Sequence, residues 1–366
     1  MKTPKKIVFY CGSLSKGGAE RVFVNLAEYF KKKHYQVYLV TPVMKDDEYQ
    51  LSPDIPRIIS DITEEELSKN RIKNFIKRYR KLRKILKDLR PDLVFSCNGK
   101  NNFMAQTASW GLHYKVIVSV VATPTVEYPT KIMQICAKIL FRFVNGVVFQ
   151  TQQAMDFFSL KVRKKGIILP NSLTPEFIRC RFEGERKKEI VAVGRLDDNK
   201  NYAMLIRAFK QIYDDFPEYT IKIYGEGEKR RELEELIHSL GMDQCAFLQG
   251  QVNDIADKIY SSMLFVMTSD TEGMPNALME AMALGLCVIS TDCPCGGPKS
   301  LISNGENGYL IPVRNENALA AQLRNCLSNP DVMQQIGRKA IQIQDFLNPD
   351  VVNAKWEKYF ESVLNS

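Results

Sequence analysis

The sequence of 366 residues has no long apolar segment, only three histidines, and no cysteine pattern typical of a disulfide or zinc framework. No uncharged stretch approaches the roughly 18 apolar residues that cross a membrane as a helix, so no spanning helix is expected. The nine cysteines are scattered and odd in number, which favours reduced thiols. Cys293 and Cys295 flank a proline, but no second Cys/His pair is spaced to complete a zinc site. We therefore expect no bound metal.

The amino terminus lacks the features of a secretory signal. Met1–Lys6 is basic, but the apolar run that follows, Ile7–Cys11, is too short, and no small-residue cleavage site comes after it. We expect this run to form the first β-strand of a cytoplasmic protein.

Short apolar runs alternate with helical patterns along the whole chain. An apolar content of 45% and a charged content of 25% are ordinary for a soluble globular protein. A length of 366 residues corresponds to about two domains. The alternation predicts an α/β fold with parallel sheets. The expected strands are 6–11, 36–41, 92–96, 116–121, 147–150 and 167–169 in the first half, and 190–194, 219–224, 245–248, 263–267 and 286–290 in the second.

The alternation is interrupted once, which sets the domain boundaries. Pro170–Pro175 breaks the first half, and Glu183–Glu189 is a charged run without core residues, which we interpret as the linker. The expected domains are 1–175 and 186–348. A last helix, 349–366, has Val352, Trp356, Tyr359, Phe360 and Val363 on one face and is expected to pack back on the first domain. Two such domains leave a cleft lined by the carboxyl ends of their strands.

One loop-to-helix segment predicts an anion-binding site. The buried strand expected at 263–267 precedes it, Pro275 suits a first helical turn, and Ala277–Leu284 favour helix. Gly273 and Met274 would present backbone N–H groups at the positive end of this helix.

Two glutamates accompany that helix. Glu272 precedes it, and Glu280 lies inside it among apolar neighbours, where a charge needs a partner. A carboxylate can accept bonds from two vicinal hydroxyls, so Glu280 suits a ribose and Glu272 a sugar. The alternative for Glu280 is a surface glutamate. Phosphate at the helix end and hydroxyls on the carboxylates together suit a nucleotide sugar.

Two further strand-to-helix loops carry candidate ligands. Arg195 and Lys200 follow the strand expected at 190–194, and an arginine fork with a lysine point charge is a common pair for holding a diphosphate. The alternative is two solvated surface cations. In the first half, Gly17 and Gly18 precede a helical pattern, where they would let the backbone approach an anion. The dinucleotide fingerprint G-x-G-x-x-G is absent.

The order of these motifs resembles that of the retaining nucleotide-sugar glycosyltransferases of the fourth family, which have two facing Rossmann-like domains (the GT-B fold). The resemblance rests on Gly17–Glu20, Arg195 with Lys200, Gly225–Gly227, Glu272 with Glu280, and Asp292–Pro298. It implies that Arg195 and Lys200 hold the diphosphate, Glu280 the ribose, and Glu272, Gly273 and Met274 the transferred sugar. It also implies that Gly17 and Gly18 close over the donor, and that Gly194, Gly225, Gly250, Pro275, Asn276 and Leu278 line the donor site. Similar sequences are often named N-acetylgalactosaminyltransferases acting on lipid-linked oligosaccharides.

The sequence departs from the family at one place. Relatives tend to show Ser-x-Arg-Asn-Asp-Pro or Ser-x-His-Asn where this chain has Ser119–Pro124, so Val121, Ala122 and Thr123 replace expected polar residues. We expect this stretch to bear on recognition of the sugar or acceptor, and less directly on activity.

The net charge of +9 is concentrated in the first half, and residues 69–90 hold eleven Lys or Arg and one acid. Their apolar residues follow helical spacing, so we expect the apolar stripe to pack on the sheet and not to form a free amphipathic anchor. The basic outer face fits an anionic membrane surface, which would present a lipid-diphosphate acceptor. Nucleic acid is the rival anion, but no base-reading motif accompanies the cations.

We therefore expect a retaining hexosyl- or N-acetylhexosaminyltransferase, peripheral at the inner face of the plasma membrane, that uses an NDP-sugar (UDP favoured) and no other cofactor. No nucleophile or general base is identifiable, and Asp197-Asp198 is not a D-x-D metal site, which favours metal-independent catalysis. The alternatives are a nucleotide-sugar epimerase of the same fold and a non-catalytic, membrane-associated subunit.

Overall fold

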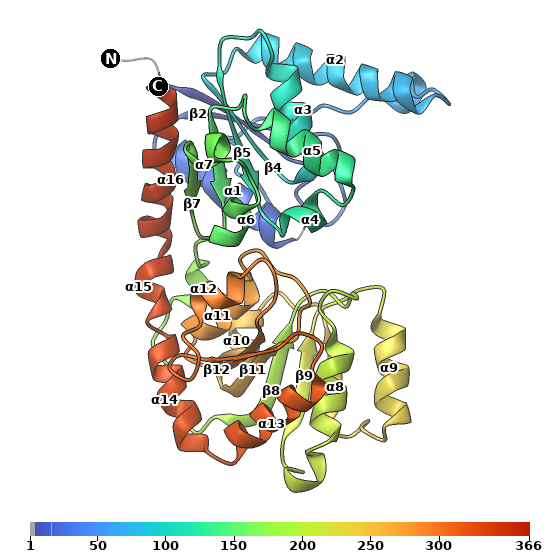
Figure 1. The fold of residues 1–366 in the computed structure, drawn as a ribbon, viewed down its shortest axis with the longest axis vertical. Helices are drawn as coiled ribbons and strands as arrows, with labels where there is room; N and C mark the ends of the chain where they lie inside the picture. The colour runs from blue at the N-terminus through green and yellow to red at the C-terminus, as the bar shows by residue number, and fades with distance from the viewer. Residues whose placement is uncertain (1–3, 16) are drawn as a thin grey trace. The chain divides into compact units, whose positions relative to one another are not determined.

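The computed structural model describes residues 4–15 and 17–366, which divide into two compact units (Figure 1). The N-terminal unit contains residues up to Asn171 together with Asp350–Ser366, and the C-terminal unit contains Ser172–Pro349. The chain thus leaves the first unit four residues before the expected boundary at residue 175. In the described residues, the strand pairs of both sheets are parallel.

The N-terminal unit is a doubly wound sheet with the strand order β3-β2-β1-β4-β5-β6-β7. Its strands are β1 Lys6–Tyr10, β2 Gln36–Thr41, β3 Arg57–Ile59, β4 Leu93–Cys97, β5 Lys115–Val120, β6 Gly146–Phe149 and β7 Gly166–Ile168. Its helices are α1 Gly18–Lys32, α2 Arg71–Leu89, α3 Gly99–Ser109, α4 Pro124–Glu127, α5 Lys131–Leu140, α6 Gln152–Asp156, α7 Leu160–Arg163 and α16 Pro349–Leu364, with a 3-10 turn η1 at Glu64–Glu66.

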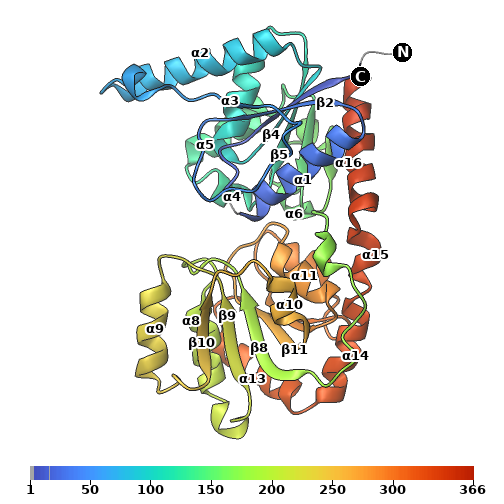
Figure 2. The ribbon, with the colours of Figure 1, turned by 180° about the vertical axis from the view of Figure 1, so that it is seen from behind.

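The two faces of this sheet are buried by different helices, as Figures 1 and 2 show. Side chains alternate along β1, so Val8 packs with Leu82 of α2 on one face. Phe9 points to the other face, where its ring lies 5.2 Å from that of Phe23 of α1. Burial on both faces explains why the strands are apolar throughout.

Helix α16 belongs to the N-terminal unit although it ends the chain. Trp356 and Phe360 are buried, and the Phe360 ring stacks 4.7 Å from that of Phe30. The Tyr359 hydroxyl accepts a bond from Val147 N at 2.9 Å. Gly146 is needed there, because a Cβ at this position would lie 2.5 Å from the Tyr359 oxygen.

The C-terminal unit repeats the architecture with the strand order β10-β9-β8-β11-β12-β13. Its strands are β8 Lys187–Val193, β9 Thr220–Tyr224, β10 Ala246–Gly250, β11 Ser262–Met267, β12 Cys287–Thr291 and β13 Tyr309–Ile311. Its helices are α8 Tyr202–Lys210, α9 Arg230–Ser239, α10 Ile255–Tyr260, α11 Asn276–Ala283, α12 Gly297–Leu301, α13 Glu316–Leu327, α14 Pro330–Ala340 and α15 Ile343–Leu347, with 3-10 turns η2 Pro175–Phe177 and η3 Tyr213–Asp215. The expected α/β fold is confirmed, and the sequence missed only the short edge strands β3 and β13 among the described strands.

The interpretation of Glu183–Glu189 as a linker without core residues is wrong, because β8 begins inside it. Glu189 is 9% exposed and accepts bonds from Lys222 at 2.5 Å and from the Ser262 hydroxyl at 3.1 Å. Arg186 is 7% exposed and donates to main-chain carbonyls. These charges are tolerated inside because polar partners surround them.

The expectation that the whole apolar stripe of α2 packs on the sheet is also wrong. Leu82 and Leu86 are buried, but Ile72, Phe75 and Ile76 are 70%, 56% and 41% exposed. Figure 1 shows that the first half of α2 extends beyond the sheet. Its apolar side chains are therefore exposed to solvent.

Candidate functional site

The candidate site lies where the winding of the C-terminal sheet reverses. Strand β8 pairs with β9 on one side and with β11 on the other, so the loops after β8 and β11 leave adjacent strand ends in the same direction. Hydrogen bonds tie the two loops together. The Thr268 hydroxyl donates to Lys200 O at 2.7 Å, and Asp270 N donates to Asn199 O at 2.8 Å.

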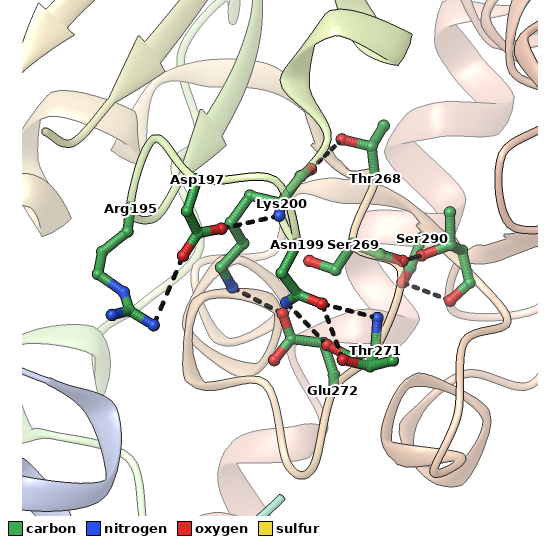
Figure 3. Close-up of polar contacts among 10 residues, drawn as sticks. Arg195, Asp197, Asn199, Lys200, Thr268, Ser269, Thr271, Glu272 and Ser290 are labelled. Carbon is green, nitrogen blue, oxygen red and sulfur yellow. Dashed lines mark hydrogen bonds and ion pairs between the residues drawn. The ribbon is translucent and has the colours of Figure 1, made fainter. Parts of the chain in front are cut away.

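An ion pair links these loops at the centre of the site (Figure 3). Lys200 Nζ lies 2.6 Å from Glu272 Oε1, and the two side chains are only 18% and 14% exposed. The main chain of Lys200 is also fixed, because its N–H donates to Asp197 Oδ1 at 3.0 Å. The structure therefore brings together two residues that the sequence placed in one site, 72 positions apart.

Arg195 lies on the other side of Asp197 from Lys200 (Figure 3). Its side chain is 82% exposed, and its guanidinium contacts Asp197 Oδ2 only at 3.5 Å. Asp197 thus contacts both expected diphosphate ligands, Arg195 through an ion pair and Lys200 through a backbone hydrogen bond. Arg195 is at the predicted strand end, but its charge extends into solvent.

Asn199 is a structural residue of the site that the sequence reasoning did not single out. Its side-chain oxygen accepts from Thr271 N at 3.1 Å and from the Thr271 hydroxyl at 2.8 Å, and its amide donates to Thr271 O at 3.0 Å. These bonds fix the residue next to Glu272. The only sequence signal was a run of polar residues directly after a buried strand.

Glycines allow three neighbouring strand ends to approach closely. Gly194, Gly225 and Gly250 have φ values of 153°, 143° and 73°. Gly225 N donates to Gly250 O at 2.8 Å, and a Cβ on Gly225 would lie 1.9 Å from Gly194 O. The three predicted donor-site glycines therefore lie next to one another, half-buried, at the carboxyl ends of β8, β9 and β10.

Helix α11 begins at Asn276, with Pro275 as its N-cap. Pro275 therefore precedes the first turn and does not lie within it. Gly273 is buried, and Gly297 packs against it so closely that a Cβ there would lie 1.6 Å from Gly273 O. Met274 is half-buried.

The remaining two predicted residues of α11 lie within the core. Leu278 is fully buried and Glu280 is 6% exposed. The surface-glutamate alternative for Glu280 is therefore wrong.

The loop after β12 is hydrogen-bonded to the main chain of Glu272. Glu272 N donates to Pro294 O at 2.7 Å, and Cys295 N donates to Glu272 O at 2.9 Å. The resemblance segment Asp292–Pro298 thus has a defined role in the structure, which is to hold the main chain of Glu272 at both its N–H and its carbonyl.

In the N-terminal unit, the Gly17–Gly18 loop leads into α1. Gly17 is the N-cap residue, and α1 begins at Gly18. A Cβ on Gly17 would lie 2.3 Å from Glu20 Oε2, so this position tolerates no side chain without movement of Glu20. The structure places the two glycines at the carboxyl end of β1, as the sequence predicts.

Glu127 holds the main chain of the stretch that departs from the family pattern, and sequence reasoning missed it. Its carboxylate accepts from Gly99 N at 2.8 Å, from Val121 N at 3.0 Å and from Ala122 N at 3.1 Å. Burial raises the pKa of Glu127, against the effect of these donors. One carboxylate therefore joins the ends of β4 and β5 through backbone groups, in a stretch where the side chains of Val121 and Ala122 are apolar.

Comparison with known proteins identifies the family. The chain matches the model of Glycosyltransferase Family 4 over residues 16–163 and that of Glycosyl transferases group 1 over residues 175–343. The two matches follow one another and together span most of the chain. The chain belongs to glycosyltransferase family 4.

Similar proteins and solved structures with a similar fold cover nearly the whole chain. An uncharacterized glycosyltransferase of Haemophilus influenzae is 24% identical over 357 residues, which are 96% of this chain and 99% of the relative. A Campylobacter jejuni enzyme, named as an alpha-1,4-N-acetyl-D-galactosaminyltransferase of a diNAcBac-PP-undecaprenol-linked sugar, is 25% identical and covers 99% of both chains. The crystal structure of Anabaena HepE with UDP and glucose superposes with a TM-score of 0.85 at 18% identity, over 98% of this chain and 100% of that one. The GT-B fold is therefore confirmed.

Among residues 4–15 and 17–366, no group of three or more His, Cys, Asp or Glu side chains is arranged to hold a metal ion. In the same part of the chain, no helix combines the length and the apolar character that crossing a membrane requires.

Proposed function

We propose that this glycosyltransferase transfers a hexose or N-acetylhexosamine from a nucleoside diphosphate sugar, UDP in the first instance, to a lipid-linked or membrane-associated glycan. The Lys200–Glu272 contact at the reversal of the sheet carries the proposal. The names of the Campylobacter jejuni relatives support the acceptor class, and the HepE complex with UDP supports the nucleotide.

The ion pair can bind both parts of such a donor without breaking. A lysine ammonium has three N–H donors, so Lys200 can keep one on Glu272 and offer the others to a phosphate. The second oxygen of Glu272 remains able to accept from sugar hydroxyls. The pair would thus hold the diphosphate and the sugar on either side of the bond that breaks.

Charge that develops on the leaving diphosphate would be stabilised by three groups. One is Lys200, and the second is Arg195, whose exposed side chain would turn from Asp197 onto a bound phosphate. The N-terminal end of α11, which follows Glu272, adds a partial positive charge. These cations take the role that a metal ion has elsewhere, which supports metal-independent catalysis.

The proposed reaction retains the anomeric configuration. The bond between the sugar C1 and the diphosphate oxygen breaks, and the acceptor oxygen bonds to C1 on the same face. The acceptor proton passes to the departing diphosphate, so no side-chain nucleophile is required. In this scheme the protein contributes preorganised charge, and the loss of one such group typically lowers turnover by about 10²–10³.

Docking on an anionic membrane surface is the second part of the proposal. The exposed apolar residues of α2 lie on the same helix as most of the eleven cations of residues 69–90. Helix α5 exposes Ile132, Ile135 and Ile139, at 75%, 56% and 49%, on one face of the same unit. Each basic residue near an anionic surface contributes about 1 kcal/mol, so this unit can hold the enzyme where a lipid-linked acceptor is presented. That placement corresponds to the inner face of the plasma membrane.

The test starts with a thermal-shift screen of UDP-, GDP- and ADP-sugars, followed by incubation of the stabilising donors with an undecaprenyl-diphosphate-linked sugar. We expect a glycosylated lipid with the donor's anomeric configuration, formed equally in the presence of EDTA. An epimerised nucleotide sugar, or tight donor binding without transfer to any lipid acceptor, would contradict the proposal. Arg195→Gln should lower the turnover, whereas Arg207→Gln, an exposed arginine of the same unit, should not.

A further inference from the structure

A polar cavity lies in the C-terminal unit, at the opposite end of β8 from the candidate site. It has a volume of about 610 Å³ and lies between residues 181–186, which precede β8, and Gln334 and Arg338 of α14. The candidate donor loop follows the last residue of β8, and this cavity precedes the first. None of the residues proposed to hold the donor lines it.

Three arginines line this cavity without a carboxylate partner. Within the described residues, none of Arg181, Arg186 and Arg338 forms an ion pair. Glu183 and Glu185 also line the cavity, but both are exposed, and within the described residues neither forms an ion pair with an arginine. By contrast, the half-buried Arg57 of the other unit pairs with Glu48 at 2.5 Å. The three arginine charges of this cavity are therefore not balanced by ion pairs, whereas the charge of Arg57 is.

Arg186 forms the buried floor of the cluster. It is 7% exposed and donates to Ser262 O at 2.7 Å and to Gly285 O at 3.1 Å. These acceptors are neutral carbonyls, and Arg186 Nε has no acceptor at all. The charge is thus solvated by dipoles but not neutralised.

Arg181 lies above it with few bonds of its own. It donates a long bond from Nη2 to Gln334 O at 3.4 Å, and its Nε also lacks an acceptor. Burial lowers the pKa of Arg181, and the nearby charge of Arg338 lowers it further. Burial likewise lowers the pKa of Arg186 to about 10, with Arg181 as the next cause. Each guanidinium charge thus disfavours the protonated form of its neighbour, and a bound anion would favour that form again.

We infer that this cavity binds an organic phosphate, with Arg181 and Arg338 as its direct ligands and Arg186 as the buried charge behind them. Arginine forks pair with phosphate oxygens in a bidentate manner, which suits the donors that Arg181 leaves unused. The volume exceeds what a bare phosphate fills and lies within the usual range of small-molecule sites, roughly 300–1,000 Å³. Glu183 and Glu185, which also line the cavity, can accept hydrogen bonds from hydroxyl groups of the organic part, so a phosphorylated sugar fits best.

The experiment is a titration of the full-length protein with inorganic phosphate and with glucose 6-phosphate, at constant ionic strength, by calorimetry. We expect saturable binding of glucose 6-phosphate that is weakened at least tenfold in Arg181→Gln/Arg338→Gln. Neither side chain is in the core, so this variant should fold, and an unchanged far-UV circular dichroism spectrum checks this. Arg186 is left intact because its bonds hold the main chain.

Two controls separate this site from others. Arg195→Gln should leave the binding unchanged, because that residue belongs to the proposed donor site. Arg207→Gln/Arg231→Gln removes the same charge from exposed positions of the same unit and should also leave it unchanged. Inorganic phosphate should bind more weakly than glucose 6-phosphate. No saturable binding of either probe, or equal binding to the Arg181→Gln/Arg338→Gln variant, would overturn the inference.

Discussion

Replacement of Lys200 by methionine tests the central ion pair. The substitution keeps most of the side-chain volume and leaves Glu272, whose side chain is 14% exposed, without its cation. At 2.6 Å and an effective dielectric constant of about 20, the lost Coulomb attraction is roughly 6 kcal/mol before desolvation is counted. Breaking a buried pair costs about 3–5 kcal/mol net, and the partial exposure of both groups favours the lower end.

A loss of ~3 kcal/mol has a measurable consequence for unfolding. For a unit of this size, the melting temperature falls by roughly 2–4 °C per kcal/mol, so we expect the C-terminal unit to melt about 6–12 °C lower. Sugar transfer should fall by about 10²–10³, because a preorganised charge on the leaving group is lost. Differential scanning calorimetry and the rate of transfer with the best donor of the screen measure the two effects.

The double variant Lys200→Met/Glu272→Gln separates stability from catalysis. It removes the uncompensated carboxylate, so most of the lost melting temperature should return. Turnover should remain low, since neither the ammonium nor the carboxylate is restored. If the double variant transferred sugar at the wild-type rate, Lys200 and Glu272 would be only a structural pair, and the proposed donor site would be wrong.

Three further predictions concern other parts of the chain. Asn199→Ala removes the three bonds to Thr271, worth about 1 kcal/mol each, and should lower kcat/KM, measured by transfer rate, by about 10²; an unchanged kcat/KM would contradict this role. Because burial raises the pKa of Glu127, the wild type should lose stability relative to Glu127→Gln as the pH rises above about 4.3, and parallel profiles in chemical unfolding would refute this. Phe75→Ser/Ile76→Ser should weaken binding to anionic liposomes, measured by flotation, by about tenfold or more. The control Leu82→Ala should lower the free energy of unfolding by about 2–5 kcal/mol and leave liposome flotation unchanged. If the double serine variant floated with liposomes as the wild type does, α2 would not be part of the docking surface.

The strands could be predicted from the sequence, because each one depends on the residues of a short apolar run. Apolar runs such as Ile7–Tyr10 are buried on both faces of a parallel sheet, and that requirement is visible in the residues themselves. The positions of Arg195, Lys200 and Glu272 at strand ends followed from the same reasoning. Their mutual contacts did not, because the pairing of β8 with β11 is set by the order of the strands in the sheet. The sequence could therefore propose a shared site but could not choose which cation meets Glu272.

Charged residues were harder to interpret, because their burial depends on partners that are distant in the chain. Arg186 looked like part of a solvated linker, yet it is enclosed by carbonyls of residues 74 to 99 positions away. Glu127 had no signal, since the donors that surround it are backbone N–H groups of Gly99, Val121 and Ala122. Any sequence offers such groups, and only the fold decides where they converge.

The exposed end of α2 could have been predicted from the lengths of the helix and of the strands that it covers. Periodicity identified the apolar stripe, but it does not tell whether a partner surface extends along all of it. A helix of 19 residues is about 28 Å long, whereas a five-residue strand such as β4 spans only about 17 Å. A helix longer than the strands it covers must extend beyond them. Apolar residues in the overhanging turns, here Ile72, Phe75 and Ile76, are therefore left exposed by the sheet, and with the surrounding cations they form the surface that we propose docks on an anionic membrane.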